Sequence, residues 1–136
     1  MASTMEIPAS SHDLFERPIL AALSTVNPDG QPHTVPVWCD FDGTYVRVNS
    51  PDSTRKARNM SEESKVTVLL IDPTNPFHWV EVMGHIVEIR DESKGARDHI
   101  NALSKKYTGN DVYRDQGNVS HNRLMYVIQP DKVHGI

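Results

Sequence analysis

Cationic and amide side chains gather on one short helix that the sequence predicts near the middle of the chain. The residues concerned are Arg55, Lys56, Arg58 and Asn59. Either Ser53 or Thr54 can cap this helix, and a helix N-terminus presents unpaired N–H groups and a partial positive charge, which favour an anion. An arginine can hold two phosphate oxygens at once, and a lysine adds a point charge. The stretch therefore predicts a phosphate-binding turn, for which the alternative is a solvated basic turn.

The histidines and the single cysteine form no recognised metal or nucleophile motif. None of the seven histidines stands four residues from another with a glutamate between them, as a helical zinc site requires. The lone Cys39 excludes a disulfide within the chain and a metal site built on paired cysteines, and we expect it to fill a strand as a small apolar residue. No order of residues suggests a Ser-His-Asp or Cys-His nucleophile. We therefore predict no metal site and assign no catalytic residue.

The composition indicates one acidic domain without a membrane span. With 136 residues the chain has the length of a single domain, over residues 1–136, and can bury a hydrophobic core. Its 14 basic and 18 acidic residues give a net charge of −4 and a pI of about 5.9, which does not fit a nucleic-acid-binding protein. No apolar run approaches the ~20 residues that cross a bilayer, and the N-terminus lacks a signal-peptide core. We expect a cytoplasmic protein.

Alternating strands and turn signals position the predicted phosphate-binding turn. The expected strands are residues 19–26, 31–40, 45–49, 65–71, 79–90 and 124–128, and short helices are expected over 9–16 and 92–107. The prolines Pro32 and Pro36 place their strand at a sheet edge or a bulge. Gly84 indicates a bulge or a close backbone approach, and Pro130 is expected to end the last strand.

Consecutive hairpins with helices inserted between them indicate an antiparallel barrel or sandwich with short peripheral helices. The fold class is therefore mainly β, with α+β character. Six short strands close a small barrel poorly, so we expect the chain to form a dimer.

Four segments of the chain, taken together, resemble a known superfamily. They are residues 23–33, 35–38, 55–60 and 80–84, and their order and spacing are more specific than any one of them. The sequence resembles the split β-barrel, FMN-binding-like superfamily typified by pyridoxamine 5′-phosphate oxidase, in particular its small actinobacterial members that use the deazaflavin coenzyme F420. The likeness extends over nearly the whole chain. It implies a split antiparallel barrel that forms a homodimer, with two equivalent cofactor sites at the subunit interface.

The resemblance also implies where the phosphate end of the cofactor binds. It places the phosphate at Arg55 and Lys56, with Asn59 and Ser50 nearby. Some members of the superfamily carry a basic residue at the position of Thr54, and this chain does not. Lys56 is therefore a stronger candidate phosphate ligand than Arg55.

The ring of the cofactor is implied to lie against the strand that contains Pro36, Val37 and Trp38. The partner subunit is implied to contribute an aromatic side chain from the loop before the long strand 79–90. In this sequence that side chain is Phe77 or Trp79.

The resemblance implies an oxidoreductase that binds coenzyme F420 and transfers a hydride from its reduced form to a small organic acceptor. The acceptor is expected to be quinone-like or to carry a conjugated ene or carbonyl. One alternative is an FMN-binding oxidoreductase of the pyridoxamine-phosphate-oxidase type, and another is a non-catalytic flavin-binding carrier or sensor. Oxidation of pyridoxamine phosphate itself is not expected, because the C-terminal segment keeps His134 but lacks the arginine of that substrate site.

Overall fold

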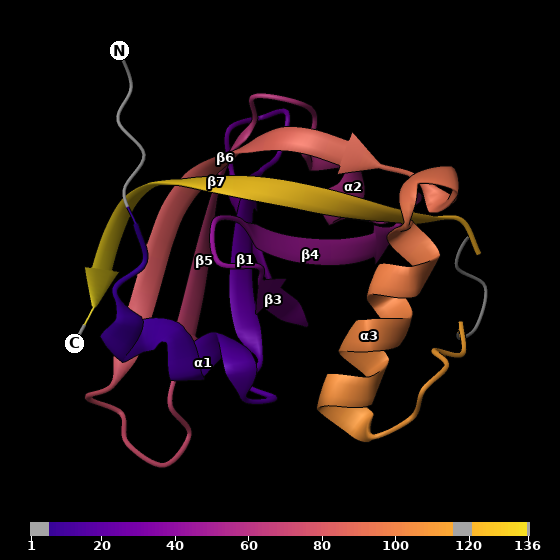
Figure 1. Cartoon of the computed structure of the whole chain (residues 1–136). Coiled ribbons are helices and arrows are strands. Elements are labelled where there is room, and N and C mark those ends of the chain that lie inside the picture. The colour runs from indigo at the N-terminus through magenta and orange to yellow at the C-terminus, as the bar shows by residue number, and fades with distance from the viewer. Residues whose placement is uncertain (1–5, 116–120, 136) are drawn as a thin grey trace.

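The computed structural model describes residues 6–115 and 121–135. In these residues seven strands form one sheet in the order β2-β1-β5-β6-β7-β4-β3, and every neighbouring pair is antiparallel. The strands are β1 (Ala21–Val26), β2 (Pro32–Val37), β3 (Cys39–Phe41), β4 (Val46–Pro51), β5 (Lys65–Ile71), β6 (Trp79–Arg90) and β7 (Arg123–Gly135). The helices are η1 (Ala9–Ser11), α1 (His12–Glu16), α2 (Arg55–Asn59), η2 (Glu92–Lys94) and α3 (Ala96–Thr108) (Figure 1).

The two edge strands of this sheet, β2 and β3, are consecutive in the chain and are separated only by Trp38. The sheet therefore curls until its two edges meet at one residue, and the result is a split β-barrel. This confirms the mainly β fold class with short peripheral helices. It also corrects the expected single strand over residues 31–40, which is broken at Trp38 into two strands. Pro32 and Pro36 both lie on the edge strand β2. An edge strand tolerates proline, because the position of the missing N–H can face away from the neighbouring strand.

The longest strands, β6 and β7, pair along their whole lengths. Gly84 of β6 lies opposite Pro130, and a register shift beside it leaves Asp131 as one extra residue on β7. A Cβ atom on Gly84 would lie 2.2 Å from the carbonyl oxygen of Gln129, so the expected close backbone approach is confirmed. The prediction that β7 ends before Pro130 is wrong. The strand continues to Gly135, because a bulge accommodates a residue that cannot donate to the ladder.

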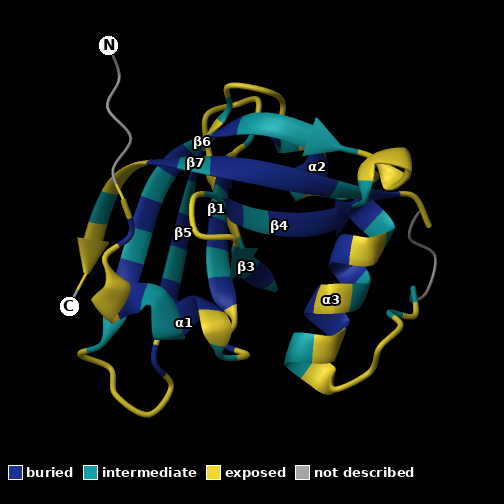
Figure 2. Cartoon of the chain, viewed as in Figure 1, coloured by how far each residue is buried: buried dark blue, intermediate teal, exposed yellow. Residues whose placement is uncertain are grey.

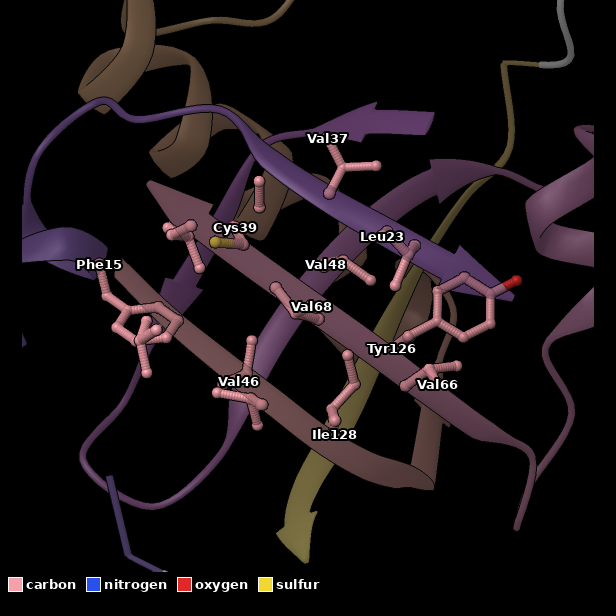
Figure 3. Close-up of a cluster of buried hydrophobic side chains, with 14 of the residues drawn as sticks. Phe15, Leu23, Val37, Cys39, Val46, Val48, Val66, Val68, Tyr126 and Ile128 are labelled. Carbon is pink, nitrogen blue, oxygen red and sulfur yellow. The ribbon is translucent and has the colours of Figure 1, made fainter. Parts of the chain in front are cut away.

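Alternate residues of the strands fill the interior of the barrel. Buried and less buried residues alternate along the strands (Figure 2). Leu23, Val48, Val68 and Ile128 come from four different strands, are at most 1% exposed and converge in one cluster (Figure 3). Cys39 belongs to the same cluster, as expected for a small apolar residue, and burial raises the pKa of its thiol to about 12.

Helix α3 packs against β7 and β4, and its C-terminal half is tied to the barrel seam. The hydroxyl of Tyr107 donates to the Ile19 carbonyl at 2.7 Å and accepts from the Cys39 N–H at 3.2 Å. The helix expected over residues 92–107 is divided, because Gly95 adopts a left-handed conformation with φ of 102° between η2 and α3. Among the described residues, the helices are all too short or too polar to cross a lipid bilayer.

Candidate functional site

A cavity of about 270 Å³ lies at the corner where β2 passes into β3. Residues from the strands, from α2 and α3, and from the chain after α3 meet around it. Its lining residues are Leu20, Pro36, Val37, Trp38, Asn49, Pro51, Lys56, Ile100, Leu103, Tyr113 and Arg123. The cavity therefore combines apolar and aromatic walls with two cationic side chains. Four residues proposed from the sequence, Pro36, Val37, Trp38 and Lys56, are brought together here.

The turn that carries Lys56 is built from polar residues at the end of β4. Thr54 is the N-cap of α2, and its hydroxyl accepts from the N–H of Ala57 at 3.2 Å. The buried Ser50 bonds the Thr54 hydroxyl at 2.7 Å and donates to the Pro51 carbonyl at 2.7 Å. Ser50 thus supports the turn from below and does not line the cavity. Its bonds hold α2 in the orientation that directs Lys56 inward.

The three cations of α2 occupy different environments. Lys56 is half-buried and lines the cavity, whereas Arg55 and Arg58 are exposed and lie outside it. Burial, and to a smaller extent the charge of Arg123, lower the pKa of Lys56. An anion that enters the cavity would favour the charged form of Lys56.

Arg123 is the second cation of the cavity and was not among the residues proposed from the sequence. It is 4% exposed, and burial lowers its pKa. Its Nε donates to Asn49 Oδ1 at 2.9 Å, and its guanidinium lies 4.9 Å from the centre of the Tyr113 ring. No local pattern could reveal Arg123, because it reaches the cavity only when β7 pairs with β4.

Aromatic rings form one wall of the cavity. Trp38 stacks on Tyr107 with ring centres 5.2 Å apart and planes inclined by 10°, and Tyr113 meets Trp38 edge-on at 5.8 Å. On the far side of this wall lies a more polar cavity of about 650 Å³, which Trp38 and Tyr113 also line. Trp38 and Tyr113 thus give this side of the cavity an aromatic lining.

The other residues proposed from the sequence lie away from the cavity. Asn59 donates from Nδ2 to Thr25 Oγ1 at 3.0 Å and to Asn27 Oδ1 at 2.9 Å, so it joins α2 to the end of β1. Phe77 is 75% exposed in the loop between β5 and β6, and Trp79 is half-buried at the start of β6. Neither aromatic residue lines this cavity within its own chain.

A cluster of possible metal ligands lies between α1 and the loop after β5. The ligand atoms of Asp13, Asp72 and His78 fall within 4.8 Å of one another. Arg17 donates to both oxygens of Asp72 at 3.0 and 3.1 Å, and His78 bonds Asp13 at 2.9 Å. Because these groups bond one another, the cluster connects α1 to the loop that carries Phe77.

A chain of buried polar groups leads from Arg123 away from the cavity. Asn49 Nδ2 donates to the Ala96 carbonyl at 2.9 Å and bonds His99 Nδ1 at 3.1 Å. The other ring nitrogen of His99 lies 3.2 Å from Asp40 Oδ2, and Arg47 donates to both oxygens of Asp40 at 2.8 and 2.9 Å. Burial alone would raise the pKa of Asp40, but the hydrogen bonds from His99 and Arg47 outweigh it and lower that pKa to about 2.

Replacing Asp40 by asparagine is expected to lower the free energy of unfolding at neutral pH by about 2 kcal/mol. The folded-state pKa lies below the ordinary value of 3.8, so the contribution of the carboxylate is present above that value and is lost as the pH falls towards about 2. Urea unfolding of the wild type and Asp40→Asn at several pH values measures this. The two should converge at low pH, whereas an exposed control, Asp98→Asn, should show no such convergence. A constant difference between Asp40→Asn and the wild type would contradict the prediction.

The comparisons with known proteins assign the curled antiparallel sheet, with the cationic, aromatic-walled cavity at its seam, to a flavin- or deazaflavin-binding oxidoreductase fold. Residues 7–136 match the family model of pyridoxamine 5′-phosphate oxidase, and the chain belongs to that family. No curated protein sequence matches the chain.

Solved structures support this assignment. An F420 reductase superposes with a TM-score of 0.78 at 28% sequence identity, over 94% of this chain and 98% of that chain. A conserved hypothetical protein from Mycobacterium tuberculosis has a TM-score of 0.65 at 22% identity, over 98% of this chain and 86% of that chain. A putative pyridoxamine 5′-phosphate oxidase from Lactobacillus delbrueckii has a TM-score of 0.64 at 18% identity, over 96% of this chain and 94% of that chain. The last two show the fold alone.

Proposed function

We propose that the protein binds coenzyme F420 in the 270 Å³ cavity and transfers a hydride from its reduced form to a small organic acceptor. The acceptor is quinone-like or carries a conjugated ene or carbonyl. The observation that carries the proposal is that Lys56 lines the same cavity as Pro36, Val37 and Trp38, so that a cation for a phosphate and a surface for a planar ring lie together. The likeness to an F420 reductase over nearly the whole chain supports F420 as the cofactor.

The residues of the cavity bind, orient and shield the reactants in this proposal. Lys56 holds the phosphate, Ser50 braces the turn beneath it, and the segment from Pro36 to Trp38 supports the ring. Ile100 and Leu103 exclude water from the reacting atoms. The reduced deazaflavin, when bound, supplies the hydride, so the protein needs no nucleophilic side chain for that step.

Arg55 and Asn59 have smaller roles in the proposed binding of the cofactor. Arg55 is exposed beside the cavity and adds positive potential near the phosphate. Asn59 would have to exchange its bonds to Thr25 and Asn27 before it could contact a ligand. His134 bonds Glu81 at 3.1 Å on the outside of the barrel, which gives no support to a pyridoxamine phosphate site at the C-terminus.

We further propose that the active form is a homodimer in which an aromatic residue of one subunit covers the cofactor ring of the other. A cavity of about 270 Å³ is at the small end for a ligand-binding pocket, so one chain encloses only part of a deazaflavin. Phe77 is the most exposed large apolar side chain among the described residues, as expected for a residue that contacts a partner.

Replacing Phe77 by alanine is expected to leave the melting temperature unchanged, because its side chain packs little within its own chain. Affinity for coenzyme F420 should nevertheless fall several-fold, since an aromatic contact contributes roughly 0.5–1.5 kcal/mol. Fluorescence titration, combined with light scattering for the oligomeric state, measures this. The control Val26→Ala removes another exposed apolar side chain and should bind as the wild type does. Unchanged affinity in Phe77→Ala would leave Trp79 as the candidate.

The proposed function is tested by titrating the purified protein with coenzyme F420 and, separately, with FMN. Reduced F420 is then offered with a panel of quinones and enones, and its reoxidation is followed. Micromolar or tighter F420 binding with turnover supports the proposal. Tight FMN binding without F420 binding favours the FMN-dependent alternative, and binding without turnover favours a carrier or sensor. Failure to bind either cofactor contradicts all three.

A further inference from the structure

Two positive charges share the walls of the main cavity. Lys56 and Arg123 both line it, and burial lowers the pKa of each. The charge of Arg123 further lowers the pKa of Lys56, so the two cations repel each other across the cavity. Asp115 Oδ1 forms an ion pair with the guanidinium at 3.8 Å from Nη1, which is beyond hydrogen-bond distance. Such an arrangement is unfavourable when empty and is relieved by an anion.

The guanidinium of Arg123 is fixed in place by its surroundings. Nε donates to Asn49 Oδ1 at 2.9 Å, and the Tyr113 ring lies 4.9 Å from the guanidinium carbon. Since Arg123 is only 4% exposed, the side chain has little freedom to leave the cavity wall. A preorganised cation binds an oxyanion without a further cost in side-chain entropy.

The orientation of Asn49 depends in turn on His99. Asn49 Nδ2 donates to His99 Nδ1 at 3.1 Å, which requires that Nδ1 carry no proton and that the ring be protonated on Nε2, facing Asp40 at 3.2 Å. His99 is 6% exposed and does not line the cavity. Its acceptor nitrogen and the Ala96 carbonyl together select the amide orientation in which Asn49 presents oxygen to Arg123.

We propose that Lys56 and Arg123 form a single oxyanion subsite in the cavity, and that His99 is a positioning residue that holds Arg123 in this subsite through Asn49. The group bound is a phosphate or a carboxylate. It belongs either to the cofactor or to the acceptor, and only this question of its source rests on the proposed function.

The subsite is tested first with inorganic phosphate as the probe, by calorimetric titration at constant ionic strength. The wild type should bind phosphate, and Arg123→Met and Lys56→Met should each weaken binding about tenfold, which is the effect of one charged hydrogen bond. The matched control Arg58→Met removes an exposed cation from the same helix as Lys56 and should bind as the wild type does. Absence of phosphate binding by the wild type, or an equal loss in Arg58→Met, overturns the subsite.

The role of His99 is tested with two substitutions of opposite expected effect. His99→Leu should weaken phosphate binding about fivefold or more, because the Asn49 amide then loses one of its two acceptors and is held only by the Ala96 carbonyl and Arg123. His99→Gln should restore binding, since its amide can accept from Asn49 and donate to Asp40. Wild-type affinity in His99→Leu, or an equal loss in His99→Gln, overturns the positioning role. If His99→Leu does not fold, nitrogen NMR of the wild type decides, because an imidazole protonated on Nδ1 is incompatible with the proposed bonds.

The source of the oxyanion is identified by ligand pairs that differ only in phosphate. These pairs are FMN with riboflavin, and coenzyme F420 with its phosphate-free deazaflavin riboside. If the cofactor supplies the group, Arg123→Met weakens only the phosphorylated member of a pair. If the acceptor supplies it, Arg123→Met leaves both members unchanged and raises KM for carboxylate-bearing acceptors only. An equal loss for both members overturns the subsite. Should neither cofactor bind, the proposed function fails, while the phosphate titration still decides on the subsite.

Discussion

Replacing Lys56 by methionine is expected to weaken the binding of coenzyme F420 about tenfold or more. A hydrogen bond between a lysine and a phosphate contributes roughly 1.5–3 kcal/mol, and methionine keeps the length of the side chain without its charge. The free energy of unfolding should be unchanged or slightly higher, because burial and Arg123 both disfavour the charged lysine in the protein without ligand. Fluorescence titration and urea unfolding measure the two quantities on the same sample.

Arg58→Met serves as the control, since Arg58 is an exposed cation on the same helix and lies outside the cavity. An equal loss of affinity in both variants would show that the helix attracts the cofactor only through its general positive charge. Arg55→Met should have an intermediate effect, because Arg55 is exposed at the first position of α2. Wild-type affinity in Lys56→Met would remove the basis for placing the phosphate in this cavity.

Replacing Gly84 by alanine is expected to lower the free energy of unfolding by about 3 kcal/mol. The new Cβ would lie 2.2 Å from the carbonyl oxygen of Gln129 and 3.0 Å from the side chain of Ile128. The first of these is a backbone atom of the paired strand, so it can move only if the pairing of β6 and β7 is disturbed. Urea unfolding with a two-state analysis measures the change.

Met83→Ala provides the comparison for Gly84→Ala. Met83 is the preceding residue on β6 and is half-buried, so its truncation removes contacts without introducing a clash. We expect a loss of about 1 kcal/mol for this variant. A Gly84→Ala protein as stable as Met83→Ala would show that the two long strands separate readily at the bulge.

Much of the secondary structure was predictable because its signals are local. Residues 65–71 and 79–90 form strands with the expected limits, and the cap of α2 is one of the two residues proposed. The errors arise where a partner in space overrides a local signal. Pro130 is a local signal for the end of a strand, but the strand continues because Gly84 lies opposite it. Residues 31–40 have the pattern of one strand, but the curled sheet turns a corner at Trp38 and divides them into two.

The candidate site was predictable only in part, for the same reason. Lys56 and the segment from Pro36 to Trp38 could be grouped through a resemblance, and the structure does bring them to one cavity. Arg123, Asn49 and Tyr113 could not be found, because their places depend on the pairing of β4 with β7 and on the path of the chain after α3. Local pattern also could not show that the side chain of Asn59 is engaged with β1.

Because the two sheet edges meet at Trp38, hydrogen–deuterium exchange should detect a ligand bound there. Strands β2 and β3 each have a hydrogen-bonded neighbour on one side only. We therefore expect their amides to be the least protected of the sheet. A ligand bound where these two strands meet contacts both of them and holds them together for as long as it is bound. Occupancy should therefore slow hydrogen–deuterium exchange along both strands, including residues that the ligand never touches.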